Sequence, residues 1–153
     1  IKTNLIKTPC KGTLWYNNGL LHNGSHFIDL LTLWFGKIKD YQIISQNNIN
    51  KNHDLILNFQ KAQIYFISTE NNKYPAFDLE IIAKNGKLFY SNGGKEIYWA
   101  QFSPHPELNE SVILEKKYKK IISALDVYQK NIADELYKAI VGKPHNLCYG
   151  YEA

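Results

Sequence analysis

The chain has 153 residues, which is enough for one domain with a buried core. Its formal charge of +4 comes with eighteen lysines and no arginine, the residue that reads bases and grips phosphates, so we expect no nucleic-acid binding. Cys10 and Cys148 are too few for a disulfide scaffold, which indicates a reducing, cytoplasmic compartment. No segment approaches the roughly 20 apolar residues that cross a bilayer, and we expect no membrane association.

The first predicted element is an apolar helix that ends at Gly36. Asn23 or Ser25 can cap its start. His26 then lies in the first turn, where the positive end of the helix dipole favours the neutral imidazole that can accept a proton. The apolar residues at helical spacing are Phe27, Leu30, Leu31 and Trp34. His22 precedes His26 by one turn, so we look for chemistry at this helix start.

Six strand-like segments follow the helix, at 38–45, 55–60, 63–68, 77–83, 87–91 and 95–102. Turn-forming residues separate them, and Asn85-Gly86 between two apolar runs is a strong hairpin signal. Several segments are apolar on both faces, as in Ile64 and Phe66 against Tyr65 and Ile67. We therefore expect a mainly antiparallel sheet whose second face is covered by a partner subunit. Alternatively, the second face of the sheet is exposed to solvent and carries isolated aromatic side chains.

The end of the sequence predicts one more strand and a long helix. Pro104 and Pro106 interrupt the strand pattern, a strand at 112–115 follows, and a helix spans about 119–141. No repeat or composition shift marks a domain boundary, so we expect one α+β domain over 1–153. Its open-faced, mainly antiparallel sheet carries helices on one face and leaves the other available for subunit contacts. Because the sequence has no methionine, we also expect a piece of a longer protein.

One segment resembles a known family. Residues 19–31, GLLHNGSHFIDLL, closing on LWFG at 33–36, resemble the C-terminal domain of the glucose–fructose oxidoreductase, inositol dehydrogenase and MocA (Gfo/Idh/MocA) family. Segments 58–66 and 77–88 look like two strands of that family and the glycine turn between them, and 139–144 is similar to its closing segment. The resemblance covers most of the chain from about Gly12 onward, and the histidine segment is its specific part.

The resemblance implies a two-domain enzyme. An N-terminal Rossmann domain, absent from this chain, would bind most of an NAD or NADP cofactor, while this domain would shape the substrate site and the subunit contacts. His26 matches the family histidine that takes the proton of the substrate hydroxyl, a role that suits a neutral imidazole near pH 7. The catalytic lysine of the family lies in the Rossmann domain, so we expect no turnover from this chain alone.

The sequence departs from the family at His22, where the family has an aspartate. Two neighbouring imidazoles disfavour double protonation, so the site would hold its substrate differently or serve a different sugar. The other predicted substrate contacts are Asn23, Trp15 and Asn18, since aromatic faces stack on sugar rings and amides bond hydroxyls. For the segment 15–18 a tight polar loop is an equally good interpretation. Cofactor contacts are not assigned. A His-x-x-x-His pair can bind metal, but no glutamate or third ligand accompanies it, and we expect none.

The leading hypothesis is therefore a fragment of an NAD(P)-dependent oxidoreductase that acts on a sugar, a polyol or a sugar derivative, as part of a homo-oligomer. His26 would be its base. The alternative is a non-catalytic sugar-binding or assembly module of the same fold, in which His26 only makes local hydrogen bonds. His53, His105 and His145 are expected at the surface.

Overall fold

The computed structural model describes residues 5–47, 52–70, 73–74 and 76–147. The chain divides into two compact units, Ile1–Ile121 and Ile122–Ala153, and each is described by itself. Within the described ranges, no helix combines the length and the apolar character that a membrane span requires.

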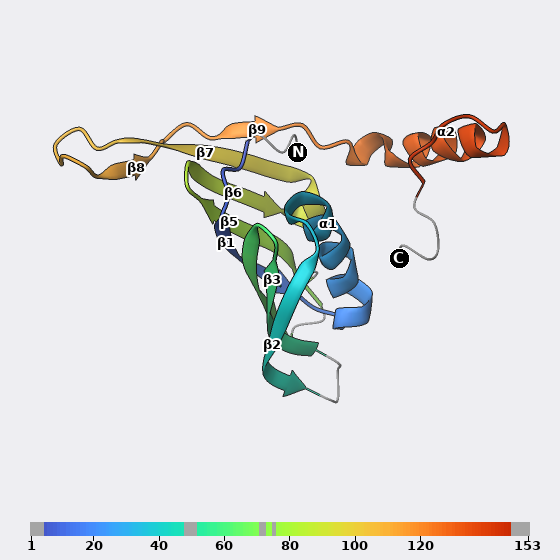
Figure 1. Ribbon diagram of the computed structural model, residues 1–153, viewed down its shortest axis with the longest axis horizontal. Helices are drawn as coiled ribbons and strands as arrows, with labels where there is room; N and C mark the ends of the chain where they lie inside the picture. The colour runs from blue at the N-terminus through green and yellow to red at the C-terminus, as the bar shows by residue number, and fades with distance from the viewer. Residues whose placement is uncertain (1–4, 48–51, 71–72, 75, 148–153) are drawn as a thin grey trace. The chain divides into compact units, whose positions relative to one another are not determined.

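The described part of the first unit is built around a sheet of nine strands (Figure 1). They are β1 (Cys10–Tyr16), β2 (Ile38–Asn47), β3 (Asn52–Phe59), β4 (Ala62–Ser68), β5 (Phe77–Ala83), β6 (Gly86–Ser91), β7 (Glu96–Pro104), β8 (Val112–Leu114) and β9 (Lys119–Ile121). Their order is β2-β3-β4-β1-β5-β6-β7-β8, and β9 also pairs with β7. Strand β1 runs parallel to β4, while the other pairs are antiparallel. The predicted mainly antiparallel sheet and the α+β class are confirmed.

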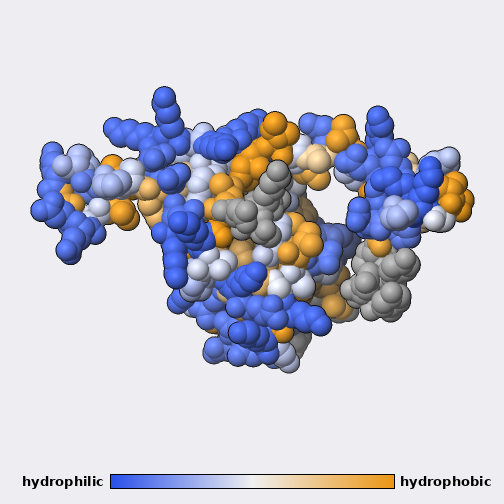
Figure 2. All heavy atoms as spheres, turned by 45° about the horizontal axis from the view of Figure 1, so that its top comes forward, coloured by the Kyte–Doolittle hydropathy of each residue, from blue (hydrophilic) through white to orange (hydrophobic). Residues whose placement is uncertain are grey.

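Side chains alternate between a buried face of this sheet and an outer face, as the pleat of a strand requires. On β5, Leu79 and Ile81 are fully buried, whereas Ile82 is 57% exposed. On β1, Leu14 and Tyr16 are buried and Trp15 is 45% exposed. Hydrophobic residues thus remain at the surface, and Figure 2 shows them as patches among hydrophilic residues.

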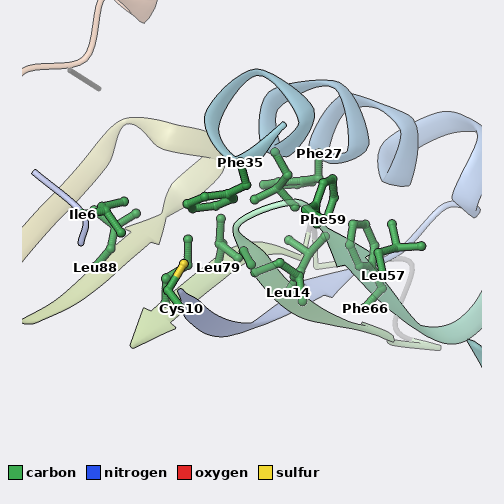
Figure 3. Close-up of a cluster of buried hydrophobic side chains, with 14 of the residues drawn as sticks. Ile6, Cys10, Leu14, Phe27, Phe35, Leu57, Phe59, Phe66, Leu79 and Leu88 are labelled. Atoms are coloured by element: carbon green, nitrogen blue, oxygen red, sulfur yellow. The ribbon is translucent and has the colours of Figure 1, made fainter. Parts of the chain in front are cut away.

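Helix α1 (Ser25–Phe35) covers the buried face of the sheet (Figure 1). Its Phe27 packs against Phe77 of β5 and Tyr90 of β6, with ring centroids 6.0 and 5.7 Å away. Figure 3 shows Phe27 and Phe35 pointing from the helix toward the apolar side chains of the strands. Burying one such side chain stabilises the fold by about 1.5–3 kcal/mol, so this apolar face fixes the helix on the sheet.

Strand β1 was missed by the sequence analysis, although it lies inside the sheet. Cys10, Leu14 and Tyr16 point into the core, and Gly12 lies between them on the same face. A Cβ at Gly12 would lie 2.5 Å from the backbone oxygen of Glu80, so only glycine allows β5 to approach this closely. Alternation interrupted by a glycine is a weak strand signal. The backbone hydrogen bonds with β4 and β5 stabilise this segment as a strand, and they involve residues far away in the sequence.

The sequence predicted one boundary near the end of the first unit correctly and one wrongly. Strand β7 ends at Pro104, as the prolines predict, two residues beyond the predicted end at 102, and Pro104 pairs with Val112 of β8. Lys119–Ile121 forms β9 on the edge of β7, with Lys120 opposite Tyr98, where the sequence predicted the first turn of a helix. Backbone pairing with β7 therefore overrides the helical spacing of this segment.

The second unit contains η3 (Leu125–Val127), a turn of 3-10 helix, and helix α2 (Tyr128–Ile140). The predicted helix is thus present but begins at Tyr128, not near Lys119. None of its described residues is buried, and Ile132 and Leu136 are each about half exposed. Glu135 accepts hydrogen bonds from Lys138 and from the backbone N–H of Asn146, and these lower the pKa of its carboxyl group.

Candidate active site

The segment between β1 and the first helix turns on two residues with positive φ. Asn18 has a φ of 60° and Gly19 a φ of 87°, a conformation that glycine adopts without a steric penalty. A turn of π-helix, η1 (Leu20–Gly24), follows and continues into α1. The helical backbone therefore begins at Leu20, which places His22 in its first turn.

This start differs from the predicted one. Gly24, the residue before α1, is already helical with φ −63° and ψ −37°, and no side chain caps α1 by a hydrogen bond. The predicted cap at Asn23 or Ser25 is wrong, because the helical turn that precedes them replaces it. His26 consequently lies in the second helical turn. The predicted end is confirmed, since Gly36 follows α1 with a φ of 83° and its N–H donates to the carbonyl of Thr32.

Buried amides hold the helix start from below. Asn17, Asn23 and Asn52 are each less than 5% exposed. The Nδ2 of Asn23 donates to Oδ1 of Asn17 over 3.2 Å, and the N–H of Gly19 donates to Oδ1 of Asn52 over 2.7 Å. Asn17 also donates to the carbonyl of Tyr74. We call Asn17, Asn23 and Asn52 the amide brace, because they tie the helix start to β1 and to the beginning of β3.

Tyr16 joins the same region from the sheet. Its Oη donates to the carbonyl of His53 and accepts from the N–H of His53 at 3.0 Å. Burial raises the pKa of Tyr16, so the phenol keeps its proton near neutral pH and remains a donor. The sequence indicated that His53 is a surface residue, but the structure places it within β3, which begins at Asn52. The Nδ1 of His53 is buried and has no hydrogen-bond partner among the described residues.

His22 and His26 lie together on the exposed side of the helix start. Their ring centroids are 6.2 Å apart with an angle of 60° between the ring planes. The Ser25 hydroxyl donates to the carbonyl of His22 at 2.7 Å. Asp29 is exposed one turn further along α1. Two imidazoles thus stand next to each other at the surface, supported by the amide brace.

The structure places the other three predicted substrate contacts in different surroundings. Asn18 is exposed in the turn before the helix. Asn23 is buried, and its amide is engaged with Asn17, so it supports the site from beneath. Trp15 faces the opposite side of the sheet from α1, because it alternates with Leu14 and Tyr16. Its contact with a sugar stays a prediction.

Asn52 was not identified from the sequence. It belongs to a polar segment, 46–54, that reads as a turn, and its partner Gly19 lies 33 residues earlier in the chain. The asparagine pair 17–18 directly before the motif was the available signal for a polar network. The described residues contain no group of three His, Cys, Asp or Glu side chains that could hold a metal ion.

No protein-family model matches the sequence, and no curated protein matches it. Solved structures do match its fold. An oxidoreductase of Bacillus subtilis, yvaA, aligns with a TM-score of 0.56 over 94% of this chain and 50% of its own chain, at 16% identity. An oxidoreductase of Bacillus cereus aligns with a TM-score of 0.56 over 95% of this chain and 61% of its own, at 17% identity.

A biliverdin reductase of Synechocystis, solved with biliverdin and NADP+, aligns with a TM-score of 0.54 over 96% of this chain and 51% of its own, at 14% identity. The chain shares the fold of these oxidoreductases. It spans between 50% and 61% of their lengths. The predicted resemblance to Gfo/Idh/MocA oxidoreductases is thereby confirmed at the level of the fold.

Proposed function

We propose that this chain is the substrate-binding and oligomerisation part of an NAD(P)-dependent oxidoreductase that acts on a sugar, a polyol or a sugar derivative. The observation that carries the proposal is the exposed pair His22 and His26 on a braced helix start, within a fold shared with oxidoreductases about twice as long. One of these structures was solved with NADP+. A nicotinamide cofactor would be held mainly by a nucleotide-binding domain outside this chain, and it would accept a hydride.

The residues of this chain fit such an arrangement. Both imidazoles are exposed, so a second domain and a substrate can reach them. His26 acts as the base: as a substrate carbinol loses its hydride, a nitrogen of His26 takes the hydroxyl proton and the carbon–oxygen bond becomes a carbonyl. The amide brace keeps the helix start in place, which limits the loss of orientation on binding.

His22 is proposed to contact the substrate beside His26. His22 stands where the family has a carboxylate, so a substrate would meet a second imidazole there. His22 can also hydrogen-bond a hydroxyl as donor or acceptor. The exposed Asn18 amide offers a further contact of this kind. The combination suits an uncharged, hydroxyl-rich substrate.

The test is nicotinamide reduction by the full-length protein against a panel of sugars and polyols. His26→Ala is expected to lower kcat by about 10²–10⁴, the usual contribution of a general base. His105→Ala is the matched control, since this histidine hydrogen-bonds only its own loop through the N–H groups of Glu107 and Leu108. Equal activity of the two variants would remove His26 from the mechanism.

The alternative function is a non-catalytic sugar-binding or assembly module. The histidine in place of the family carboxylate at position 22 is the observation that favours it. In that case the wild-type protein reduces no nicotinamide with any member of the panel, yet still binds a sugar or assembles. Calorimetric titration with the same sugars and polyols shows whether an inactive protein still binds one of them.

A further inference from the structure

An open groove of about 680 Å³ lies at the end of the sheet where β1 begins. It is lined by the start of β1, the turn between β3 and β4 and the end of β5, at residues 9–11, 58–63 and 82–84. Strand β1 leads away from this groove for seven residues before it reaches the amide brace. A strand rises about 3.3 Å per residue, so β1 separates the groove from the helix start by roughly 20 Å. The groove is therefore separate from the candidate active site.

Lysines gather around the groove. Lys11, Lys61 and Lys84 line it, and all three side chains are exposed. The backbones of two more lysines lie beside the lining residues, since the carbonyl of Lys7 accepts from the N–H of Lys84 over 3.2 Å and that of Lys37 accepts from the N–H of Gln60 over 3.1 Å. None of the five forms an ion pair with a carboxylate in the described part of the chain.

Two carboxylates near the groove have partners other than its lysines. Glu80 on β5 pairs with Lys87 of β6 over 2.7 Å, and Asp40 on β2 accepts from the amide of Asn58. Asn58 in turn accepts from Gln63 over 2.8 Å. Neither carboxylate pairs with Lys11, Lys61 or Lys84, so the three lysines that line the groove outnumber the acidic groups there and give it a positive potential.

The remaining lining is apolar or unreactive. Ile82 is more than half exposed, and Pro9 and Ala62 complete an apolar wall. Burial raises the pKa of the Cys10 thiol to about 11, so this cysteine contributes no thiolate and no nucleophile. Lysine stems can lie along such a wall while their ammonium groups stay in water.

We propose that the groove binds a small phosphorylated molecule, with its phosphate groups among Lys11, Lys61 and Lys84 and its organic part against Ile82. Lysines act as point charges toward phosphate and need no fixed fork of hydrogen bonds. The volume lies within the range of small-molecule sites, which favours a compact ligand over a nucleic acid. This site is independent of the chemistry proposed for His26.

The experiment is calorimetric titration of the full-length protein with inorganic pyrophosphate and, separately, with a nucleoside diphosphate. Saturable binding is expected, and the double variant Lys61→Gln with Lys84→Gln should lose at least about tenfold in affinity. The control is Lys116→Gln with Lys117→Gln, which removes the same charge from an exposed segment outside the groove and should stay within about twofold.

Ile82→Ser distinguishes the two ligand sources. It should weaken the nucleoside diphosphate and leave pyrophosphate unchanged if the apolar wall holds an organic group. The proposal is overturned by equal losses in the two lysine pairs, which indicate unspecific attraction, or by absence of saturable binding. Tighter binding of an oligonucleotide that displaces pyrophosphate would overturn it as well. Circular dichroism of each variant verifies that its fold is retained.

Discussion

Asn52 shows how a single buried side chain supports a surface site. Its Oδ1 accepts from Gly19, while its Nδ2 is buried without a partner among the described residues. Asn52→Ala leaves the N–H of Gly19 unpaired, and we expect a loss of about 1–3 kcal/mol in the free energy of unfolding by urea. Gln42→Ala on β2 is the control, since this amide is exposed and should cost less than about 0.5 kcal/mol. Equal effects of the two substitutions would contradict the bracing role.

Asp54 gives the stability a dependence on pH. Partial burial opposes the charge of its carboxylate, but hydrogen bonds from Ser68 N–H, Ser68 Oγ and Ser45 Oγ outweigh it and lower its pKa below the ordinary 3.8. Because the folded pKa is the lower one, this contribution is complete above about pH 4 and disappears as the pH falls through the folded pKa. The measurement that checks this is the free energy of unfolding by urea at pH 6 and at pH 3. Its decrease from pH 6 to pH 3 should be smaller for Asp54→Asn than for the wild type. An identical loss would remove Asp54 from the acid response.

At the scale of elements, the helix and most strands could be predicted because their signals are local. Neighbouring residues are enough to predict the apolar spacing of α1, its end at Gly36 and the turn at Asn85 between β5 and β6. Strand β1, the strand at Lys119–Ile121 and the contact of Asn52 with Gly19 depend on partners far away in the chain. Single-sequence patterns carry no information about such pairings, and the burial of Asn23 was missed for the same reason.

Strand β1 depends on the small size of Gly12. A methyl group there would collide with the backbone oxygen of Glu80 at 2.5 Å, and backbone atoms in the middle of a sheet cannot move aside cheaply. Gly12→Ala is expected to lower the free energy of unfolding by about 1–3 kcal/mol, the range for overpacking. Thr13→Ala on the same strand, half-buried on the outer face, should cost less. A neutral Gly12→Ala would mean that β1 and β5 are less closely packed than the structure shows.

At the scale of the whole molecule, the two faces of the sheet differ in how they are covered. Helix α1 covers one face with Phe27, Leu31 and Phe35. The outer face leaves apolar side chains partly exposed to water, and besides Trp15 these are Ile56, Tyr65, Ile67, Phe89 and Tyr98. Ile82 at the end of this face belongs to the groove. The register of the other side chains forms two groups: Trp15 is opposite Ile67 and Ile56 is opposite Tyr65, while Phe89 is opposite Tyr98. Asp78 and Glu80 of β5 separate the two groups, and the larger one, around Trp15, is an exposed apolar cluster of a kind typical of an interface between proteins.

We propose that a second copy of the protein covers the apolar cluster around Trp15. A charge at its centre would be desolvated on association, so Trp15→Lys combined with Ile67→Lys, its neighbour on β4, should convert an oligomer of the full-length protein into a smaller species in sedimentation analysis. Leu33→Lys is the matched control, because Leu33 is 78% exposed on α1, away from the outer face, and its replacement should leave the mass unchanged. An unchanged mass in the double variant would show that these side chains are simply solvated. A wild-type monomer at micromolar concentration would exclude the interface directly, since the apolar face would then remain in water at concentrations where interfaces of ordinary size persist.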